Sequence, residues 1–197
     1  MDHSDRLRHQ RLRIRLISIA TGVALAGAAS LITYAVVQAG KVQSPTAIAT
    51  PTLAGGAEAP QFDLARLGGG GSVSLAAYRG RPVIINFFAS YCTYCRQELG
   101  AFAAVSARPG GVVFIGIDAE DPNPGQALAM MRSAGDRYAT GVDPNGTVAN
   151  EYDVFGLPET VAVDASGRIV EVSRGAETAA GLSRIVATLS GQGGGHP

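Results

Sequence analysis

The sequence predicts one α/β domain with a mixed sheet, preceded by a single N-terminal transmembrane helix. Two observations predict the domain: apolar runs of strand length alternate with helical segments between residues 60 and 190, and the last two strands flank a tight turn. An uncharged apolar stretch behind an arginine-rich start predicts the helix. The length, 197 residues, fits one ordinary domain with an appendage.

The N-terminal region has the charge pattern of a signal anchor. Residues 1–15 carry five arginines and two aspartates, a net charge of +3, and predict a cytoplasmic basic segment. In the 22 residues of 16–37, 16 are apolar and the rest are Gly, Ser or Thr. At a helical rise of about 1.5 Å per residue this stretch spans about 33 Å, so residues 16–39 are predicted to cross the cell membrane once. The domain is then expected on the extracytoplasmic side.

A cleaved signal peptide is the competing interpretation of this region. Val37-Gln38-Ala39 is a passable small-residue cleavage site. The apolar stretch is longer than the apolar region of a signal peptide, which favours an uncleaved anchor. Residues 40–59 are rich in Pro, Thr, Ala and Gly and predict a flexible linker, residues 60–190 the folded domain, and residues 191–197 a disordered tail.

Composition removes several function classes. Hydrophobic residues make up 46% and charged residues 16%, which is a globular composition. The 16 basic and 16 acidic residues balance, which argues against a nucleic-acid partner. The three histidines, at positions 3, 9 and 196, lie outside the predicted domain. A Ser-His or Cys-His nucleophile and most metal sites are therefore not expected.

The elements of the domain follow from apolar patterning. The runs at 82–89 and 112–117 are continuously apolar, as in central parallel strands covered on both faces. Strands at 160–163 and 169–173 flank a glycine-containing turn, which predicts an antiparallel edge pair. Gly68–Gly71 predicts a hairpin turn or loop. Helices are expected at residues 92–106, 125–133, 147–152 and 178–189.

Both cysteines lie in one motif, Cys92-Thr93-Tyr94-Cys95, between a buried strand and a helix. A thiol at a helix N-terminus ionises more readily, because the free N–H groups and the helix dipole favour an anion. Cys92 is therefore the expected attacking thiol, exposed and acidic, and Cys95, one turn deeper, the resolving thiol. Half of a zinc site and an inert structural disulfide are the alternatives. Asp121-Pro122-Asn123-Pro124 reads as a turn into a helix with no chemistry.

Two segments carry a resemblance to a known family. Residues 80–98, GRPVIINFFASYCTYCRQE, and residues 154–164, VFGLPETVAVD, resemble the active-site segment and the cis-proline strand of the TlpA/ResA/CcmG (DsbE) family. Members of this family are membrane-anchored, thioredoxin-like thiol–disulfide oxidoreductases. The resemblance covers residues 60–190 and implies a thioredoxin fold, with parallel centre and antiparallel edge hairpin flanked by helices.

The family assigns roles to four further residues. Pro158 is expected in the cis form, facing Cys92, with Leu157 offering its backbone to a substrate strand; an ordinary trans proline is the alternative. Some ResA-like relatives have a buried acid/base glutamate where this chain has Glu98, and a solvated helix residue is the alternative. Tyr91 replaces the usual tryptophan before the first cysteine. It keeps an aromatic ring at the expected substrate site and adds a hydroxyl that could reach a thiolate; the alternative is that the change has no consequence.

The predicted function is an extracytoplasmic thiol–disulfide oxidoreductase, expected to act as a protein-disulfide reductase in cytochrome c maturation or cell redox homeostasis. Its partners would be protein disulfides, such as apocytochromes c, and a membrane electron-donor protein. No cofactor is expected beyond the Cys92–Cys95 disulfide itself. An oxidase of secreted proteins and a non-catalytic binding module remain alternatives, because the Thr93-Tyr94 dipeptide leaves the direction of electron flow open.

Overall fold

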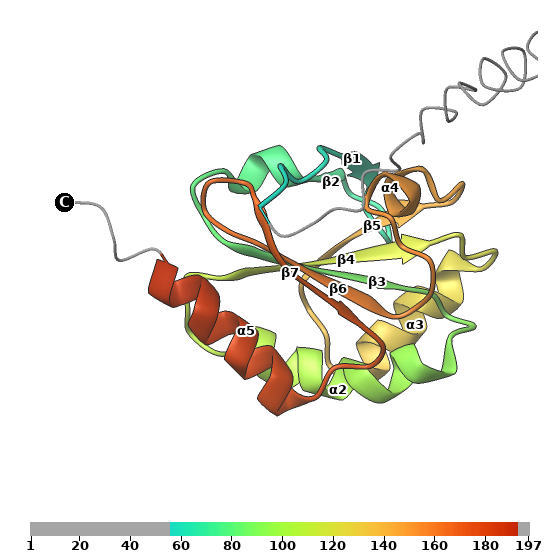
Figure 1. Ribbon diagram of the computed structural model, residues 1–197. Helices are drawn as coiled ribbons and strands as arrows, with labels where there is room; N and C mark the ends of the chain where they lie inside the picture. Colours follow the sequence, from blue (N-terminus) through green and yellow to red (C-terminus); the bar gives the residue numbers. More distant parts are fainter. Residues whose placement is uncertain (1–55, 193–197) are drawn as a thin grey trace, which may run out of the picture. The chain divides into compact units, whose positions relative to one another are not determined.

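The computed structural model describes residues 56–192, which form a five-stranded mixed sheet with helices on both faces and a small two-stranded hairpin (Figure 1). The elements, in chain order, are β1 (Asp63–Ala65), β2 (Ser72–Ser74), the 3₁₀ helix η1 (Leu75–Tyr78), β3 (Val83–Phe88), α2 (Thr93–Ser106), β4 (Val113–Ala119), α3 (Pro124–Ala134), β5 (Ala139–Asp143), α4 (Thr147–Glu151), β6 (Glu159–Val163), β7 (Ile169–Arg174) and α5 (Ala179–Gln192).

The predicted cytoplasmic segment, membrane helix and most of the linker lie outside the described residues, as does the predicted tail from residue 193. Within residues 56–192 no helix is long and apolar enough to cross a membrane. The domain extends beyond its predicted limits at both ends. Glu58 forms a β-bridge with Arg168 and Ala59 is 2% exposed, so the end of the predicted linker belongs to the fold. Helix α5 continues to Gln192, two residues into the predicted tail.

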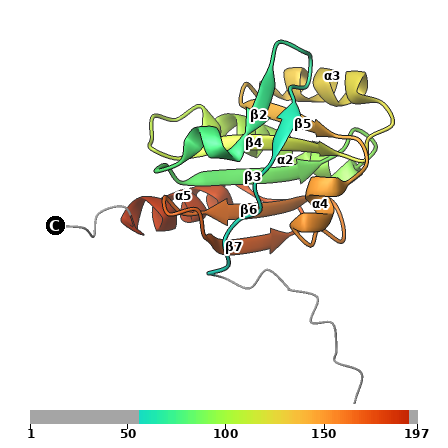
Figure 2. The same cartoon turned by 90° about the horizontal axis from the view of Figure 1, so that it is seen from above.

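The strand order β5-β4-β3-β6-β7 confirms the predicted parallel centre and antiparallel edge pair (Figure 2). β3 runs parallel to β4 and antiparallel to β6, and β6 pairs antiparallel with β7. All residues of β3 and β4 are buried, which explains why both strands read as continuous apolar runs. The glycine run 68–71 connects β1 and β2 as an antiparallel hairpin, as expected.

The two faces of the sheet are covered by different elements. Helices α2, α3 and α5 lie on one face, and the β1–β2 hairpin, η1 and α4 lie on the other (Figure 1). On the hairpin face the ring of Tyr152 packs 5.3 Å from that of Phe87 and 6.4 Å from that of Phe62. On the helical face Phe102 of α2 packs edge-to-face on Phe114 of β4 at 6.2 Å. Successive residues of β3 therefore point alternately into two separate cores, one on each face of the sheet.

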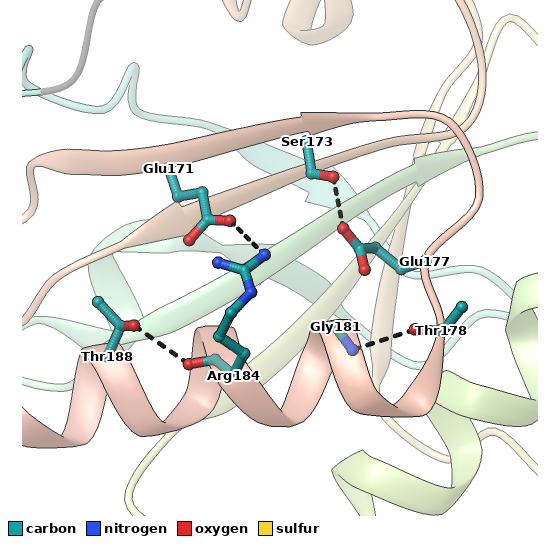
Figure 3. A network of polar contacts seen from close by, with 7 residues as sticks. All are labelled: Glu171, Ser173, Glu177, Thr178, Gly181, Arg184 and Thr188. Atoms are coloured by element: carbon teal, nitrogen blue, oxygen red, sulfur yellow. Dashed lines mark hydrogen bonds and ion pairs between the residues drawn. The ribbon is translucent and has the colours of Figure 1, made fainter.

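Helix α5 is attached to the edge strand β7 by polar contacts at its start and in its middle (Figure 3). Arg184 forms an ion pair with Glu171 of β7 at 2.9 Å. Ser173 of β7 donates a hydrogen bond to Glu177 in the loop before the helix. Thr178 accepts the backbone N–H of Gly181 at 3.1 Å, as an N-cap does. The position of this loop matters for the site, because its backbone contacts Glu98.

Strand β5 was not predicted. The turn between β1 and β2 was predicted, but the two short strands themselves were not. β5 has the sequence ATGVD, which is short and has no apolar run or clear alternation. Its glycine is required by packing: a Cβ at Gly141 would lie 2.7 Å from the Cβ of Leu64 in β1. The strand exists because β4 offers a free edge and β1 covers it, and neither partner is visible in the local sequence.

We expect Gly141→Ala to destabilise the domain by about 1–3 kcal/mol, because the added methyl group overpacks the contact between β5 and Leu64. Gly100→Ala is the matched control, since a Cβ at this helical position meets nothing within 4 Å and alanine favours a helix. Urea unfolding measures both. Equal stability of Gly141→Ala and the wild type would contradict the packing argument.

Candidate functional site

The two cysteines form a disulfide at the point where β3 ends and α2 begins. The S–S distance is 2.07 Å. Cys92 is the N-cap of α2, and its Sγ accepts the backbone N–H of Cys95 at 3.1 Å. The helix N-terminus thus points at the Cys92 sulfur and favours its thiolate once the bond is reduced. The position of Cys92 at the start of α2 therefore supports its expected role as the attacking thiol.

Cys95 is more buried than Cys92, as predicted, but Cys92 is less exposed than predicted. Cys95 is fully buried, and Cys92 is 9% exposed. Cys92 is less open than predicted because it packs in one cluster with Phe88 and Leu157. Only Cys92 reaches the surface groove, so an incoming partner can contact this sulfur and not the other.

The Leu157–Pro158 peptide bond is cis, as predicted, and the alternative of a trans proline is wrong. Glu159, the next residue, pairs with Phe87 of β3, which brings the proline to the end of the sheet where Cys92 lies. The Pro158 carbonyl accepts the N–H of Gly175 at 2.9 Å. Within residues 56–192 neither the N–H nor the carbonyl of Leu157 has a hydrogen-bond partner. The backbone of Leu157 can therefore pair with an added strand.

A surface groove of about 460 Å³ runs past Cys92 and Leu157. Its rim carries the three large apolar side chains that are most exposed within residues 56–192: Tyr91 at 58%, Tyr94 at 64% and Phe155 at 79%. Tyr91 was expected here from the sequence, and Tyr94 and Phe155 were not. We call these three residues the aromatic rim. Exposed aromatic side chains around a concave site are typical of a surface that binds another molecule.

Glu98 lies on α2, three residues after Cys95, and is 1% exposed. The alternative of a solvated helix residue is therefore wrong. Its Oε2 accepts the backbone N–H of Glu177 at 2.9 Å, and its Oε1 has no hydrogen-bond partner in the described part of the chain. Burial raises the pKa of Glu98 to about 7, although the hydrogen bond from Glu177 opposes this shift. The carboxyl group can therefore bind or release a proton near neutral pH.

Asp121 holds the loop before Cys92, a role that the sequence analysis missed. Its carboxylate accepts the hydroxyl of Ser90 at 3.0 Å, the backbone N–H of Ser90, and the N–H of Asn123 at 2.8 Å. Arg96 adds a bond to the Ser90 carbonyl at 2.6 Å. Ser90, two residues before Cys92, is thus held from both sides. An aspartate just beyond the strand next to β3 was the available signal, but it reads equally well as a turn residue.

Two neighbouring carboxyl groups differ in pKa at this end of the sheet. Burial alone would raise the pKa of Asp121, but the hydrogen bonds from Ser90 and Asn123 hold it below the usual value. Asp118 is fully buried, and burial together with the charge of Asp121 raises its pKa to about 8. One group of the pair is thus ionised at neutral pH while the other keeps its proton.

No group of three metal-ligating side chains occurs within residues 56–192.

We expect Asp118 to make the domain less stable as the pH rises. The unfolded chain ionises this group near pH 4, whereas the folded state keeps it protonated up to about pH 8. The contribution of Asp118 to the free energy of unfolding is therefore fully present below about pH 4 and is lost progressively as the pH rises to about 8. Asp118→Asn should therefore flatten the pH dependence of urea unfolding between pH 5 and 8, and the exposed Asp63→Asn should not. Parallel curves for the wild type and Asp118→Asn would contradict the assignment.

The matching family model is described as the AhpC/TSA family and covers residues 56–172. A "thiol:disulfide interchange protein DsbE homolog" of Paracoccus denitrificans is 37% identical over 124 residues, 62% of this chain and 67% of the relative. The "thiol:disulfide interchange protein HelX" of Rhodobacter capsulatus is 34% identical, over 62% of this chain and 69% of the relative. A DsbE protein of Allochromatium vinosum is 40% identical over 46% of this chain, which is 49% of that relative.

Solved structures give the same result for the fold. A putative DsbE of Chlorobium tepidum has a TM-score of 0.63 at 25% identity, over 70% of this chain and 98% of that chain. A secreted Mycobacterium tuberculosis disulfide oxidoreductase homologous to DsbE has a TM-score of 0.59 at 25% identity, over 66% and 96% of the two chains. The predicted thioredoxin fold is confirmed, and the chain belongs to the AhpC/TSA family.

Proposed function

We propose that this member of the AhpC/TSA family is a membrane-anchored, extracytoplasmic protein-disulfide reductase. The main support for this proposal is the Cys92–Cys95 disulfide at the start of a helix. It lies next to a groove in which the Leu157 backbone has no hydrogen-bond partner among residues 56–192. This site and the relatives named thiol:disulfide interchange proteins confirm the coarser prediction from the sequence, a thiol–disulfide oxidoreductase.

The reaction moves two electrons from the dithiol to the partner disulfide. The Cys92 thiolate attacks one partner sulfur, the partner S–S bond breaks, and the released partner thiolate takes a proton from water. The Cys95 thiol gives its proton to the Glu98 carboxylate and attacks Cys92. The Cys92–Cys95 bond forms, the mixed disulfide breaks, and the partner sulfur that Cys92 attacked leaves as a thiolate. The partner is reduced, and the enzyme is left oxidised.

The groove supplies two kinds of contact for the partner chain. An extended segment can add as a strand to Leu157, whose backbone N–H and carbonyl are free within the described residues. The aromatic rim covers the apolar side chains of that segment, which excludes water from the sulfur under attack. Partial burial, followed by the charges of Glu120, Asp121 and Asp118, raises the pKa of Tyr91 further from neutral pH, so its phenol stays uncharged at this site.

The acidic groups near the dithiol favour a reductant over an oxidant. A strong oxidant of this class has a stabilised thiolate in its reduced form. Here the Glu98 carboxyl lies one helical turn beyond Cys95, and its negative charge opposes a thiolate nearby. The reduced dithiol therefore gives up its electrons more readily. From the resemblance to the TlpA/ResA/CcmG family, the substrates are the haem-attachment cysteines of apocytochromes c, and a membrane electron-donor protein restores the dithiol.

We expect Cys95→Ser to accumulate mixed disulfides between Cys92 and its partners, because the resolving thiol is missing. Cys92→Ser is the matched control and should trap none, since Cys95 is fully buried. Non-reducing electrophoresis followed by identification of the trapped proteins measures both. Apocytochromes c among the trapped species support the proposal, whereas a wide set of secreted proteins favours the oxidase. Trapping by Cys92→Ser alone would reverse the two roles.

The anchor at residues 16–39 places the domain outside the cytoplasm in this proposal, on the charge pattern of residues 1–39. A membrane-impermeant thiol reagent applied to intact cells after mild reduction should label Cys92, because this sulfur lies at the groove. A cytoplasmic protein with a free thiol is the control and should stay unlabelled. Labelling of Cys92 only after lysis would contradict this orientation.

A further inference from the structure

A row of buried polar side chains continues from Glu98 into the helical face of the sheet. Its other members are Asn86 on β3, Tyr138 just before β5, and Asp136 between α3 and β5. Asn86 is 0% exposed and Asp136 8%, and the Tyr138 hydroxyl is buried. Within residues 56–192 only the Oε2 of Glu98 has a hydrogen-bond partner among the side-chain polar atoms of this row. Buried polar groups are usually bonded, so such a row calls for a functional explanation.

The packing of the sheet brings these side chains together. Asn86 is in register with Gly116 on β4, and Gly116 is in register with Thr140 on β5. A Cβ at Gly116 would lie 3.1 Å from the Tyr138 ring, so the missing side chain makes room for that ring beside Asn86. Phe102, one turn after Glu98 on α2, packs against the same ring at a centroid distance of 6.1 Å. Glu98 and Tyr138 therefore lie on the same face of the sheet, each next to Asn86.

The members of the row also affect each other's charge. Burial, followed by the charge of Asp136, raises the pKa of Tyr138 well above 10, with a smaller contribution from the charge of Glu98, while the neighbouring Asn86 amide opposes the shift. Burial is the main cause of the raised pKa of Glu98; the neighbouring Asn86 amide opposes the shift, and the charges of Glu177 and Asp136 add to it. Burial raises the pKa of Asp136 to about 7, so both carboxyl groups can exchange protons near neutral pH.

The row ends at a second opening of the domain. Tyr138 and Asp136 line a cleft of about 170 Å³ that also involves Arg66 from the end of β1, Arg132 of α3 and Arg137. This cleft shares no residue with the groove at Cys92. Glu98 itself is closed to solvent, and a partner docked in the groove would cover the dithiol as well. A proton taken up by Glu98 therefore needs another way out, and the row leads to one.

We propose that Tyr138 and Asp136 form a proton relay that connects Glu98 with the cleft lined by Arg66, Arg132 and Arg137. The proposal rests on the proposed function, in which Glu98 takes the proton of Cys95. The Tyr138 hydroxyl can accept one proton while it donates its own. When side-chain motion brings Glu98 and Tyr138 into hydrogen-bond contact, the proton that leaves Glu98 adds to the Tyr138 oxygen. The hydroxyl proton passes in the same way to the Asp136 carboxylate, which releases it to water. Asn86 is a positioning residue that holds Glu98 and Tyr138 in place.

The test measures how fast Cys95 resolves a mixed disulfide as the pH changes. The full chain in detergent micelles is reduced and mixed with oxidised glutathione, and stopped-flow quenching follows the glutathione adduct on Cys92. Tyr138→Phe should slow the resolution step about tenfold near pH 7, since positioned proton transfer contributes at least that much. Asp136→Asn should slow it in the same pH range. Both variants should lose the inflection of the rate near pH 7.

Tyr152→Phe is the matched control, because it also removes a buried tyrosine hydroxyl, bonded to the Pro60 carbonyl, but on the other face of the sheet. It should resolve the adduct as the wild type does. Urea unfolding shows whether each variant is folded, and Asp136→Asn carries the test if Tyr138→Phe is not. Wild-type rates at every pH in the folded variants would overturn the relay.

Glu98→Gln separates this failure from failure of the proposed function. If Glu98→Gln is slow while Tyr138→Phe and Asp136→Asn are fast, Glu98 keeps its acid/base role and the relay alone is wrong. If Glu98→Gln resolves the adduct at the wild-type rate, Glu98 takes no part in the proton transfer, and the relay that serves it is overturned as well.

Discussion

The pairing of the central strand β3 with both of its neighbours is the constraint on which the site depends. β3 pairs parallel with β4 and antiparallel with β6, and all six of its residues are buried. Phe88 lies opposite Asp118, and Phe87 opposite Glu159. The chain before Cys92, the carboxyl pair at the end of β4 and the proline before β6 therefore meet at one end of the sheet. A shift of this register would separate the disulfide from the residues that support it.

A second constraint is the burial of carboxyl groups around the disulfide. Ionised carboxylates are costly to bury, and such groups respond by keeping their protons. Asp118 does so, and Glu98 ionises only near neutral pH, whereas Asp121 stays ionised because it accepts hydrogen bonds from Ser90 and Asn123. The ionised group holds the loop before Cys92 in place, and Glu98 can exchange a proton. The environment of each carboxyl, and not its residue type, thus decides whether it acts in structure or in chemistry.

The elements that could be predicted from the sequence are those whose signal is local. The strands β3 and β4, the helix α2 and the turn between β6 and β7 were all predicted to within a few residues. The Cys92–Cys95 pair followed from its motif, and the cis bond before Pro158 followed from the resemblance of its segment to the TlpA/ResA/CcmG family. β5 was missed because its small residues suit a neighbour, Leu64, that lies far away in the chain. The contact of Asp121 with Ser90 spans 31 positions and leaves no local pattern.

The sequence by itself determined the reactive pair and its setting, because a CxxC motif between a buried strand and a helix is defined by neighbouring residues. The sequence also has Pro158 and Leu157 at the separation from the CxxC motif that the resembling family shows. Only the tertiary structure decided that Glu98 is buried, that Tyr94 and Phe155 join Tyr91 at the groove, and that Asn86 and Tyr138 lie in one buried row. Burial, exposure and charge coupling depend on which segments pack together, and chain folding sets those contacts over distances that local sequence patterns do not describe.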